Sequence, residues 1–540
     1  MLVKRFYSKS LMPGCRNQRS EFAKSLISNS HIGILLIAIF QMLLTDSTFA
    51  QELNRRIVGY YTSWSIYARD YHVTDIPAEM ISHVNYAFAN ISPTEGAIIL
   101  GDPYADIDRF YPGDSWDPDS LRGCFHQLII LKAQYPHLKT LISVGGWTWS
   151  VYFSDIALTE ESRHTFAVSC AEFINEYDFD GVDIDWEYPV SGGHPDNHYR
   201  PEDRQNYTLL LEGLREQLDS LEQVNNQEYL LTIAAPANPN VIANIEVELI
   251  HQYLDWINVM TYDFHGPWDG PADIVTNFNS PLYIALGDPL GEPYHSSFNL
   301  EAAIQTYLAL GVPGNKLHPG LAFYGRGYGN VVNVNNGLFA DYQGPSPNGT
   351  WENGVFDFWD IAENYINLNG YVAYWHDDAK VPWVYNPGMQ VMVSYDDSIS
   401  IAEKGLFINV IDLGGAMFWE FSADRYGLLL SSIYNELSYP SMVRNEGHRS
   451  IVPNIFKLSQ NCPNPFNAST TIRFNIPEPS HIILDIYDIL GRRVETLVNE
   501  QRRAGYHQAI WNADDFSSGV YFYKIQAGEY TETKKMVLLK

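Results

Sequence analysis

The sequence predicts an α/β protein built on a (β/α)8 barrel, with a small α+β insertion lobe and a C-terminal all-β, sandwich-like domain. Three observations predict this fold class. From Arg56 onward, short β-rich runs alternate with longer amphipathic segments, which is typical of parallel βα units. One late connection is too long to lack structure of its own. After residue 438 the chain changes to short strand-like runs broken by Pro, Gly and Asn.

The β-rich runs supply the expected barrel strands. Each is followed by a segment that is long enough for a helix, and eight such units fit a (β/α)8 barrel that carries insertions. The runs begin at Ile57, Ile81, Lys139, Gly181, Tyr229, Trp256, Leu317 and Gly414.

Two long connections are expected at the carboxyl ends of barrel strands. Residues 326–392 separate the seventh and eighth runs and should form the α+β lobe. The second connection, from Ser92 to Ser120, follows the second run and is rich in Asp, Pro and Gly. Active sites of (β/α)8 barrels lie at these strand ends, so we expect both connections to wall a deep cleft.

The ends of the chain indicate export and a separate second domain. Residues 1–50 resemble a signal peptide, because basic residues precede an apolar run from Ile32 to Leu44. A membrane anchor is the alternative, but the run is shorter than the roughly 20 residues of a spanning helix. We expect the barrel and lobe within 51–438, a linker at 439–454 and the β domain at 455–540.

Charge and composition limit the classes of molecule that the protein could bind. The formal net charge of −30 would repel nucleic acid and anionic membranes, whereas a neutral substrate is compatible with it. The acidity also has a simpler reading, since it keeps an exported protein soluble. The 13 Trp and 36 Tyr residues suit either a packed core or a surface on which sugars stack, and composition does not separate these.

Only Cys124 and Cys170 could form a disulfide within the main domain, because Cys15 belongs to the predicted signal peptide and Cys462 lies far along the chain. Both residues fall in helix-like segments. An exported protein permits the bond, and two buried free thiols remain the alternative.

Carboxyl and apolar side chains alternate through residues 181–187. Asp183, Asp185 and Glu187 share one face of this predicted strand. In a barrel strand the apolar face must meet the surrounding helices, so the three carboxyls should point into the lumen. A solvated acidic face is the alternative, but it would need a sheet that is open to water on one side.

Three inward carboxyls at a spacing of ~6.5 to 7 Å cannot all be comfortably ionised in a low-dielectric interior. We expect Asp183 and Asp185 to share one proton. Glu187, at the open end of the strand, should stay protonated until it donates its proton. The pattern therefore predicts an acid that works near neutral pH.

The same segment resembles the signature D-x-x-D-x-D-x-E of the family-18 glycoside hydrolases, with Asp180, Asp183, Asp185 and Glu187 at the acidic positions. The resemblance extends from about Arg56 to Arg425 and looks closest to the chitinase branch with an α+β insertion. Its further segments are SVGGW (143–147), MTYDFHG (260–266), YGRG (324–327) and VSYDD (393–397).

This resemblance implies a chitinase that cuts β-1,4-linked N-acetylglucosamine polymers with retention and needs no cofactor. In that family the nucleophile is the N-acetyl oxygen of the substrate, and an oxazolinium ion is the intermediate. Glu187 would protonate the leaving oxygen and later activate water. Asp185, beside Asp183, would orient the acetamide and stabilise the cation, and Tyr262 would donate a hydrogen bond to the attacking oxygen.

The resemblance also implies a set of substrate contacts by position in matching motifs. Core packing is the alternative for each aromatic residue, but Trp64 and Trp268 follow strand ends, where a bare ring would be exposed. Met260 and Tyr262 share the inward face of one strand, whereas Asp263 breaks the alternation and rests on the family pattern alone. The set comprises Tyr60, Trp64, Phe88, Gly146, Trp147, Met260, Asp263, Trp268, Arg326 and Trp419.

The C-terminal segment resembles the sorting domain of type IX secretion cargo. The similarity lies in LSQNCPNPFN (458–467), SSGVYFYKI (517–525) and the basic end KKMVLLK. It implies the secretion machinery as a partner and a secreted or surface-attached protein. A chitin-binding module is the alternative, but Trp511 is the only tryptophan there, and a flat platform needs several rings.

Two other functions share parts of this pattern. An endo-β-N-acetylglucosaminidase acting on glycans would use the same catalytic strand, although Trp147, Trp268 and the insertion favour a long polymer. A sugar-binding lectin descended from the enzyme would usually lack the terminal acid, and Glu187 is present. His194 and His198 lack a metal-ligand spacing with carboxylates, so we expect no metal.

Overall fold

The computed structural model describes two parts of the chain. The first is 55–438 without 118–119, 269 and 271–272. The second is 456–540 without 459–460, 462–463, 478, 503–504, 514–515 and 529. The expected signal peptide and linker, with Cys15 and Cys462, lie outside the described residues.

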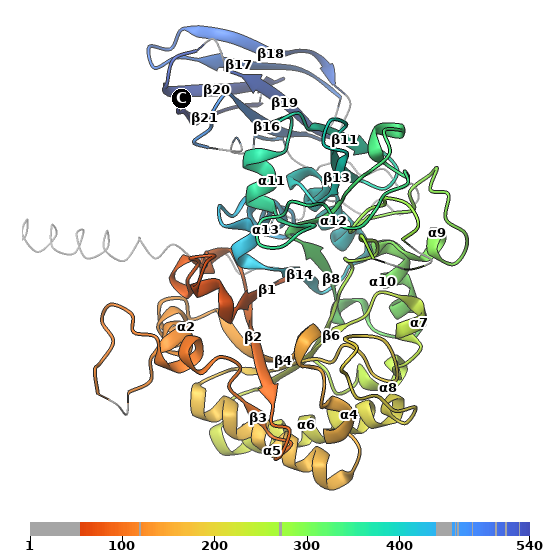
Figure 1. Ribbon diagram of the computed structural model, residues 1–540. Helices are drawn as coiled ribbons and strands as arrows, with labels where there is room; N and C mark the ends of the chain where they lie inside the picture. Colours follow the sequence, from red (N-terminus) through yellow and green to blue (C-terminus); the bar gives the residue numbers. More distant parts are fainter. Residues whose placement is uncertain are drawn as a thin grey trace, which may run out of the picture. The chain divides into compact units, whose positions relative to one another are not determined.

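The first part is a closed barrel of eight parallel strands, as predicted. The ring runs β1-β14-β8-β7-β6-β5-β4-β2, and the pairing of β1 with β2 closes it. Strands β1 and β14 come from opposite ends of the barrel sequence and lie side by side (Figure 1). The strands are β1 (Arg56–Thr62), β2 (His83–Ile91), β4 (Lys139–Gly145), β5 (Gly181–Asp185), β6 (Leu230–Ala235), β7 (Trp256–Val259), β8 (Leu317–Ala322) and β14 (Gly415–Trp419).

Helices surround this ring and cover the outward faces of its strands. α5 begins after Thr159, whose hydroxyl accepts from the Ser162 N–H, and ends at Asp178 in the left-handed conformation. None of the described helices is long and apolar enough to cross a membrane. The longer helices are α2 (Gly123–Gln134), α5 (Glu160–Tyr177), α6 (Asp203–Asn225), α10 (Leu300–Ala309), α12 (Ser398–Ile411) and α13 (Leu428–Ser438), and the short ones are α3 (Gly146–Trp149), α4 (Phe153–Ile156), α7 (Pro239–Ile242), α8 (Val247–Ile250) and α9 (Tyr294–Ser297).

The insertion between β8 and α12 forms a lobe around an antiparallel sheet. Its strand order is β10-β9-β13-β12-β11, and its sheet runs from Tyr324 to Ser394, slightly beyond the expected 326–392. The lobe has its own apolar cluster, which includes Tyr328, Tyr385 and Met392. Its elements are β9 (Tyr324–Tyr328), β10 (Val355–Asp357), α11 (Phe358–Asn364), β11 (Val372–His376), β12 (Val381–Asn386) and β13 (Val391–Ser394).

The second part is all β, as predicted, and consists of two antiparallel sheets that share one apolar cluster. Trp511 is fully buried in that cluster, and its Nε1 donates to Glu495 Oε2 at 2.8 Å. Its ring is therefore not a surface on which a sugar could stack. The sheets are β15 (Lys457–Leu458), β16 (Ser469–Ile476) and β19 (Gly505–Asn512), and β18 (Arg493–Arg502), β17 (Ser480–Tyr487), β20 (Gly519–Ala527) and β21 (Tyr530–Leu538).

The two cysteines of the barrel part are free thiols. Cys124 lies on α2 and Cys170 on α5, and both are buried in the core between helices and strands. The structure therefore favours the free-thiol alternative over the disulfide.

Candidate active site

A cleft of about 1000 Å³ opens at the carboxyl ends of the barrel strands. The lobe contributes one wall, through Arg326, Glu352, Val355 and Asp357. Such a volume exceeds that of a single-sugar pocket and suits an extended ligand.

The described part of the connection 92–120 contributes no lining residue, contrary to the expectation that it walls the cleft. Its strand β3 (Ile98–Ile99) pairs with the end of β2. The buried Asp106 accepts a hydrogen bond of 2.6 Å from the hydroxyl of Tyr86, which packs in the outer core. These contacts fasten the connection to the outer side of the barrel.

Strand β5 presents its apolar and acidic side chains to opposite sides. Trp186 packs outward, with its ring stacked on Phe153 at 5.3 Å and edge-on to Tyr207 of α6 at 5.2 Å. Asp183 faces the lumen, where it contacts side chains from other strands across the ring. The alternation read from the sequence therefore describes this strand.

Asp183 accepts hydrogen bonds from four strands. Tyr60 of β1 and Ser143 of β4 donate to Oδ2 at 2.7 and 2.8 Å. Thr232 of β6 and Asn258 of β7 donate to Oδ1 at 2.5 and 3.3 Å. Burial raises the pKa of Asp183, and these hydrogen bonds oppose that rise.

The hydrogen bonds of Asp183 and Asp185 bear on the expected sharing of a proton between the two carboxyl groups. Both oxygens of Asp183 already accept two hydrogen bonds each, which satisfies an ionised carboxylate. Asp185 instead has a buried Oδ1 without a partner. Burial raises the pKa of Asp185 well above its ordinary value, and the charges of Glu187 and Asp183 add to the rise.

Glu187 follows β5 and lines the cleft. Burial raises the pKa of Glu187 to about 7, and the charge of Asp263 adds to that effect. Its main chain is held from both sides, because Ser150 Oγ accepts from the Glu187 N–H at 2.9 Å and Asn197 donates to the Glu187 carbonyl at 2.6 Å. Glu187 is thus a positioned carboxylic acid that keeps its proton near neutral pH.

Tyr262 and Asp263 both line the cleft although they are neighbours in sequence. The cause is the backbone, because Asp263 has φ of +55° and lies in the left-handed region. Arg326 of β9 holds the Asp263 carboxylate with two hydrogen bonds, from Nε at 2.8 Å and from a terminal nitrogen at 2.7 Å. The ring of Tyr324 lies edge-on to Tyr262 with centroids 6.0 Å apart.

Aromatic side chains line the cleft, and four of them form a connected cluster around Trp419. Trp419 at the end of β14 lies 5.4 Å from Tyr60, 6.3 Å from Trp64 and 5.8 Å from Phe88, measured between ring centroids. Trp64, Trp147 and Trp268 are 38%, 50% and 41% exposed, and Met260 also lines the cleft. Phe88 is only 8% exposed, so it serves both as packing and as cleft wall.

Gly146 differs from the other predicted contacts because it does not line the cleft, whereas its neighbour Gly145 does. Its φ is +78°, and a Cβ at this position would lie 2.7 Å from the ring of Phe88. Glycine is required here to let the Phe88 ring approach the backbone, so Gly146 acts through Phe88.

Sequence reasoning missed several cleft residues. Tyr188 and Tyr324 line it, and so do Arg69 and Asp357, which form an ion pair of 2.8 Å. Tyr324 could have been found, because it opens the YGRG segment from which only Arg326 was taken. Arg69 and Asp357 lie in segments without a motif, and only the fold brings them together.

The two histidines considered as metal ligands make different contacts. His198 Nδ1 is 2.5 Å from Asp155 Oδ2, which fastens the loop after β5 to α4. His194 packs edge-on against Trp147 at 6.4 Å. Within the described residues, no group of three or more His, Cys, Asp or Glu side chains is arranged to hold a metal ion.

Comparison with known families gives two matches that together cover most of the chain. The family described as "Glycosyl hydrolases family 18" matches residues 56–424. The family described as "Secretion system C-terminal sorting domain" matches residues 462–539.

Individual relatives agree with the first match. "Chitinase A1" of Niallia circulans is 42% identical over 78% of this chain, which spans 64% of that protein's length. "Endochitinase 1" of Metarhizium robertsii is 36% identical over 72% of this chain and 86% of its own length. Among solved structures, "Chitinase ChiA74 from Bacillus thuringiensis" is 34% identical with a TM-score of 0.67, covering 90% of this chain and 84% of that one.

Proposed function

The chain belongs to glycosyl hydrolase family 18, and on this premise we propose that it is a secreted chitinase. It hydrolyses β-1,4 linkages between N-acetylglucosamine units with retention. The observation that carries this proposal is the acidic series of the buried Asp183 and Asp185 with Glu187, which ends in an aromatic cleft large enough for a polymer. The relatives named above are described as chitinases, which supports the same substrate class.

The proposed reaction begins with proton transfer from Glu187 to the leaving glycosidic oxygen. The acetamide oxygen of the sugar attacks its own anomeric carbon, and an oxazolinium ion forms. Asp185 orients the acetamide and stabilises the cation, and the Tyr262 hydroxyl donates a hydrogen bond to the acetamide oxygen. Glu187, now ionised, then removes a proton from the water that opens the ring.

Asp183 contributes to this mechanism indirectly, through Asp185. Its negative charge is fixed by four donors and lies beside Asp185, where it raises the pKa of that carboxyl. The charge of Asp183 thus adds to the effect of burial, which is the main cause of the raised pKa of Asp185. Arg326 holds the Asp263 carboxylate in place through two hydrogen bonds.

Substrate binding is assigned to the aromatic surface of the cleft. Trp419 and its neighbours Tyr60 and Phe88 would form an apolar floor beneath the sugar at the cleavage point. The half-exposed rings of Trp64, Trp147 and Trp268 would stack sugars farther along the chain. The polymer would therefore contact aromatic rings along its length, and the catalytic carboxyl groups at the bond that is cleaved.

Export completes the proposal. Residues 1–50 would direct the chain out of the cytoplasm, and the C-terminal β domain would act as a sorting signal for a secretion machinery. The barrel with its lobe, within 51–438, would be the catalytic domain.

The direct test is incubation of the purified protein with crystalline chitin and with short N-acetylglucosamine oligomers. Release of shorter N-acetylglucosamine oligomers is the expected result. Absence of cleavage of both substrates by a folded protein would contradict the proposed function.

Removing the C-terminal domain tests whether this domain serves export alone or also takes part in catalysis. A protein that ends at residue 454 is expected to hydrolyse soluble oligomers at nearly the parental rate, because each proposed catalytic group belongs to the barrel. The measurement is kcat and KM on a soluble oligomer, with circular dichroism to verify folding. Loss of oligomer hydrolysis by the folded truncated protein would make the β domain part of the catalytic unit.

The pKa of Glu187 predicts the alkaline side of the pH profile. A general acid must be protonated, and Glu187 keeps its proton up to a pH of about 7 because burial raises its pKa from 4.5. kcat/KM on a soluble oligomer should therefore fall as the pH rises through about 7.

A matched variant tests whether Glu187 sets this limit. The pKa of Asp106 is also raised by burial to about 7, but Asp106 lies outside the cleft. Asp106→Asn should leave the midpoint of the alkaline limb unchanged. A midpoint near 4.5 in the parent would show that Glu187 is not buried in the way described here.

A further inference from the structure

A buried ion pair lies behind the cleft, outside the groups used above. Lys404 of α12 and Asp396, just after β13, are 0% and 1% exposed, with Lys404 Nζ at 2.6 and 2.8 Å from the two carboxylate oxygens. Replacing a buried ion pair by apolar side chains often leaves stability unchanged or raises it. Stability alone therefore gives little reason for this pair.

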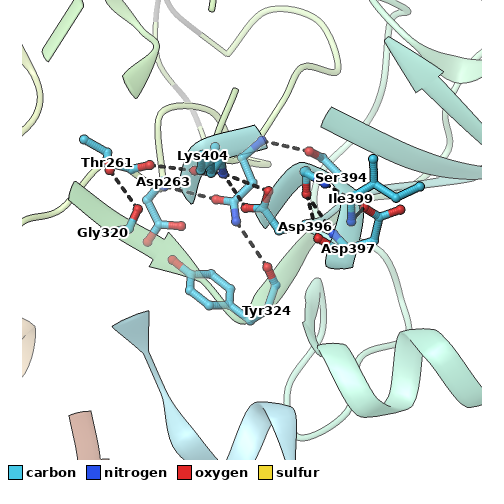
Figure 2. Close-up of polar contacts among 12 residues, drawn as sticks. Thr261, Asp263, Gly320, Tyr324, Ser394, Asp396, Asp397, Ile399 and Lys404 are labelled. Atoms are coloured by element: carbon cyan, nitrogen blue, oxygen red, sulfur yellow. Dashed lines mark hydrogen bonds and ion pairs between the residues drawn. The ribbon is translucent and has the colours of Figure 1, made fainter. Parts of the chain in front are cut away.

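Lys404 also reaches the segment that carries Tyr262. Its ammonium group donates to Ser280 Oγ at 2.7 Å, and Ser280 Oγ is 2.6 Å from the carbonyl of Thr261. An ammonium group can only donate, so the single hydroxyl proton of Ser280 is directed at Thr261. Thr261 Oγ1 in turn donates to the carbonyl of Gly320 in β8 at 2.7 Å, and Figure 2 shows this last contact together with Lys404 and Asp396.

Asn279 holds the other side of Tyr262. Its Oδ1 accepts from the Asp263 N–H at 3.0 Å and its carbonyl accepts from the Phe264 N–H at 3.1 Å. Its own N–H donates to Ser394 of β13 at 2.8 Å, and its amide group donates to the Tyr324 carbonyl at 3.3 Å. Asn279 is 1% exposed, so these contacts are not shared with bulk water.

These contacts hold a backbone that is costly for a residue other than glycine. The left-handed φ of +55° at Asp263 turns the chain so that Tyr262 and Asp263 both face the cleft. Residues other than glycine adopt such a conformation only occasionally, and it persists where neighbouring groups fix it. Asn279 and Ser280 supply that fixation at the residues directly on either side of Tyr262.

We propose that Ser280 and Asn279, supported by the Lys404 and Asp396 ion pair, are positioning residues for Tyr262. They hold its hydroxyl where the acetamide oxygen attacks, so the last strand of the lobe helps to set the catalytic geometry. This inference rests on the proposed function, because it assigns Tyr262 to the chemical step. A loss of position at Tyr262 should then impair the transition state more than the binding of intact substrate.

The test is Ser280→Ala, assayed on a soluble N-acetylglucosamine oligomer. We expect kcat to fall about 3- to 10-fold, because that factor corresponds to the loss of one hydrogen bond, and we expect KM to change little. The affinity for a thiazoline mimic of the cyclic intermediate should fall by a similar factor. In a Glu187→Gln background, the Kd of the unhydrolysed oligomer should stay the same.

Ser432→Ala is the matched control. The Ser432 hydroxyl is also buried and donates at 2.6 Å to a carbonyl, that of Ser398 at the start of α12, but it does not touch residues 261–264. This variant should lose thermal stability much as Ser280→Ala does, yet keep its kcat and its thiazoline affinity. If Ser280→Ala shows the same pattern as the control, the network is purely structural and the inference is wrong.

A second variant decides the matter if Ser280→Ala does not fold. Lys404→Met combined with Asp396→Leu removes both charges, so no unpaired charge remains buried. It should lower kcat and thiazoline affinity together, and parental values for both would overturn the inference. A parent protein that neither cleaves the oligomer nor binds the thiazoline would instead overturn the proposed function together with this inference.

Discussion

Glu187→Gln is expected to fold like the parent and to lose at least ~10²-fold in kcat on N-acetylglucosamine oligomers. The amide keeps the size and shape of the side chain but carries no proton that it can give to the leaving oxygen. The main-chain contacts with Ser150 and Asn197 are unaffected by the change, so the side chain should keep its place. Binding of the intact oligomer should therefore survive.

The effect is measured as kcat on a soluble oligomer, together with the Kd of that oligomer by calorimetry. Glu403→Gln on α12 is the matched control, because burial also raises the pKa of Glu403 and its side chain lies outside the cleft. The control should turn over as the parent does. Near-parental turnover by pure, folded Glu187→Gln would remove Glu187 from the mechanism.

The catalytic strand could be predicted from the sequence because its geometry is regular. In β5 the side chains alternate without interruption, so the apolar face defines the helix side and the carboxyls must face the lumen. The eight strands were recognised for the same reason, since each carries a compact β-rich run.

The errors lie where the backbone departs from that regularity or where distant segments meet. The entry of Asp263 into the cleft depends on a left-handed φ that no alternation pattern indicates. The hydrogen-bond partners of Asp183 come from four strands, so they could not be predicted from one segment of the sequence. The path of the 92–120 connection could not be predicted because it depends on the pairing of β3 with β2 and on the contact between Tyr86 and Asp106.

Hydrolysis should require an N-acetyl group on the sugar at the non-reducing side of the cleaved bond. Among the cleft carboxyls, Asp185 lies beside Asp183 deep in the barrel and is assigned to the acetamide, not to the anomeric carbon. The nucleophile is then part of the substrate, where its attack has the proximity advantage of an intramolecular reaction. Cellulose and fully deacetylated chitosan should therefore be inert.

The stereochemistry of the product provides a second test of the same step. The anomeric carbon is inverted once by the acetamide and once by water, so newly released ends should appear first as the β-anomer. Proton NMR can follow this signal before mutarotation.

A thiazoline mimic should inhibit, because the site is complementary to the cyclic intermediate more than to the starting sugar. Chitin oligomers of the same length are the control for chitosan. An initial α-anomer, or comparable cleavage of fully deacetylated chitosan, would show that a group of the protein or a water molecule attacks directly, even with the barrel fold unchanged.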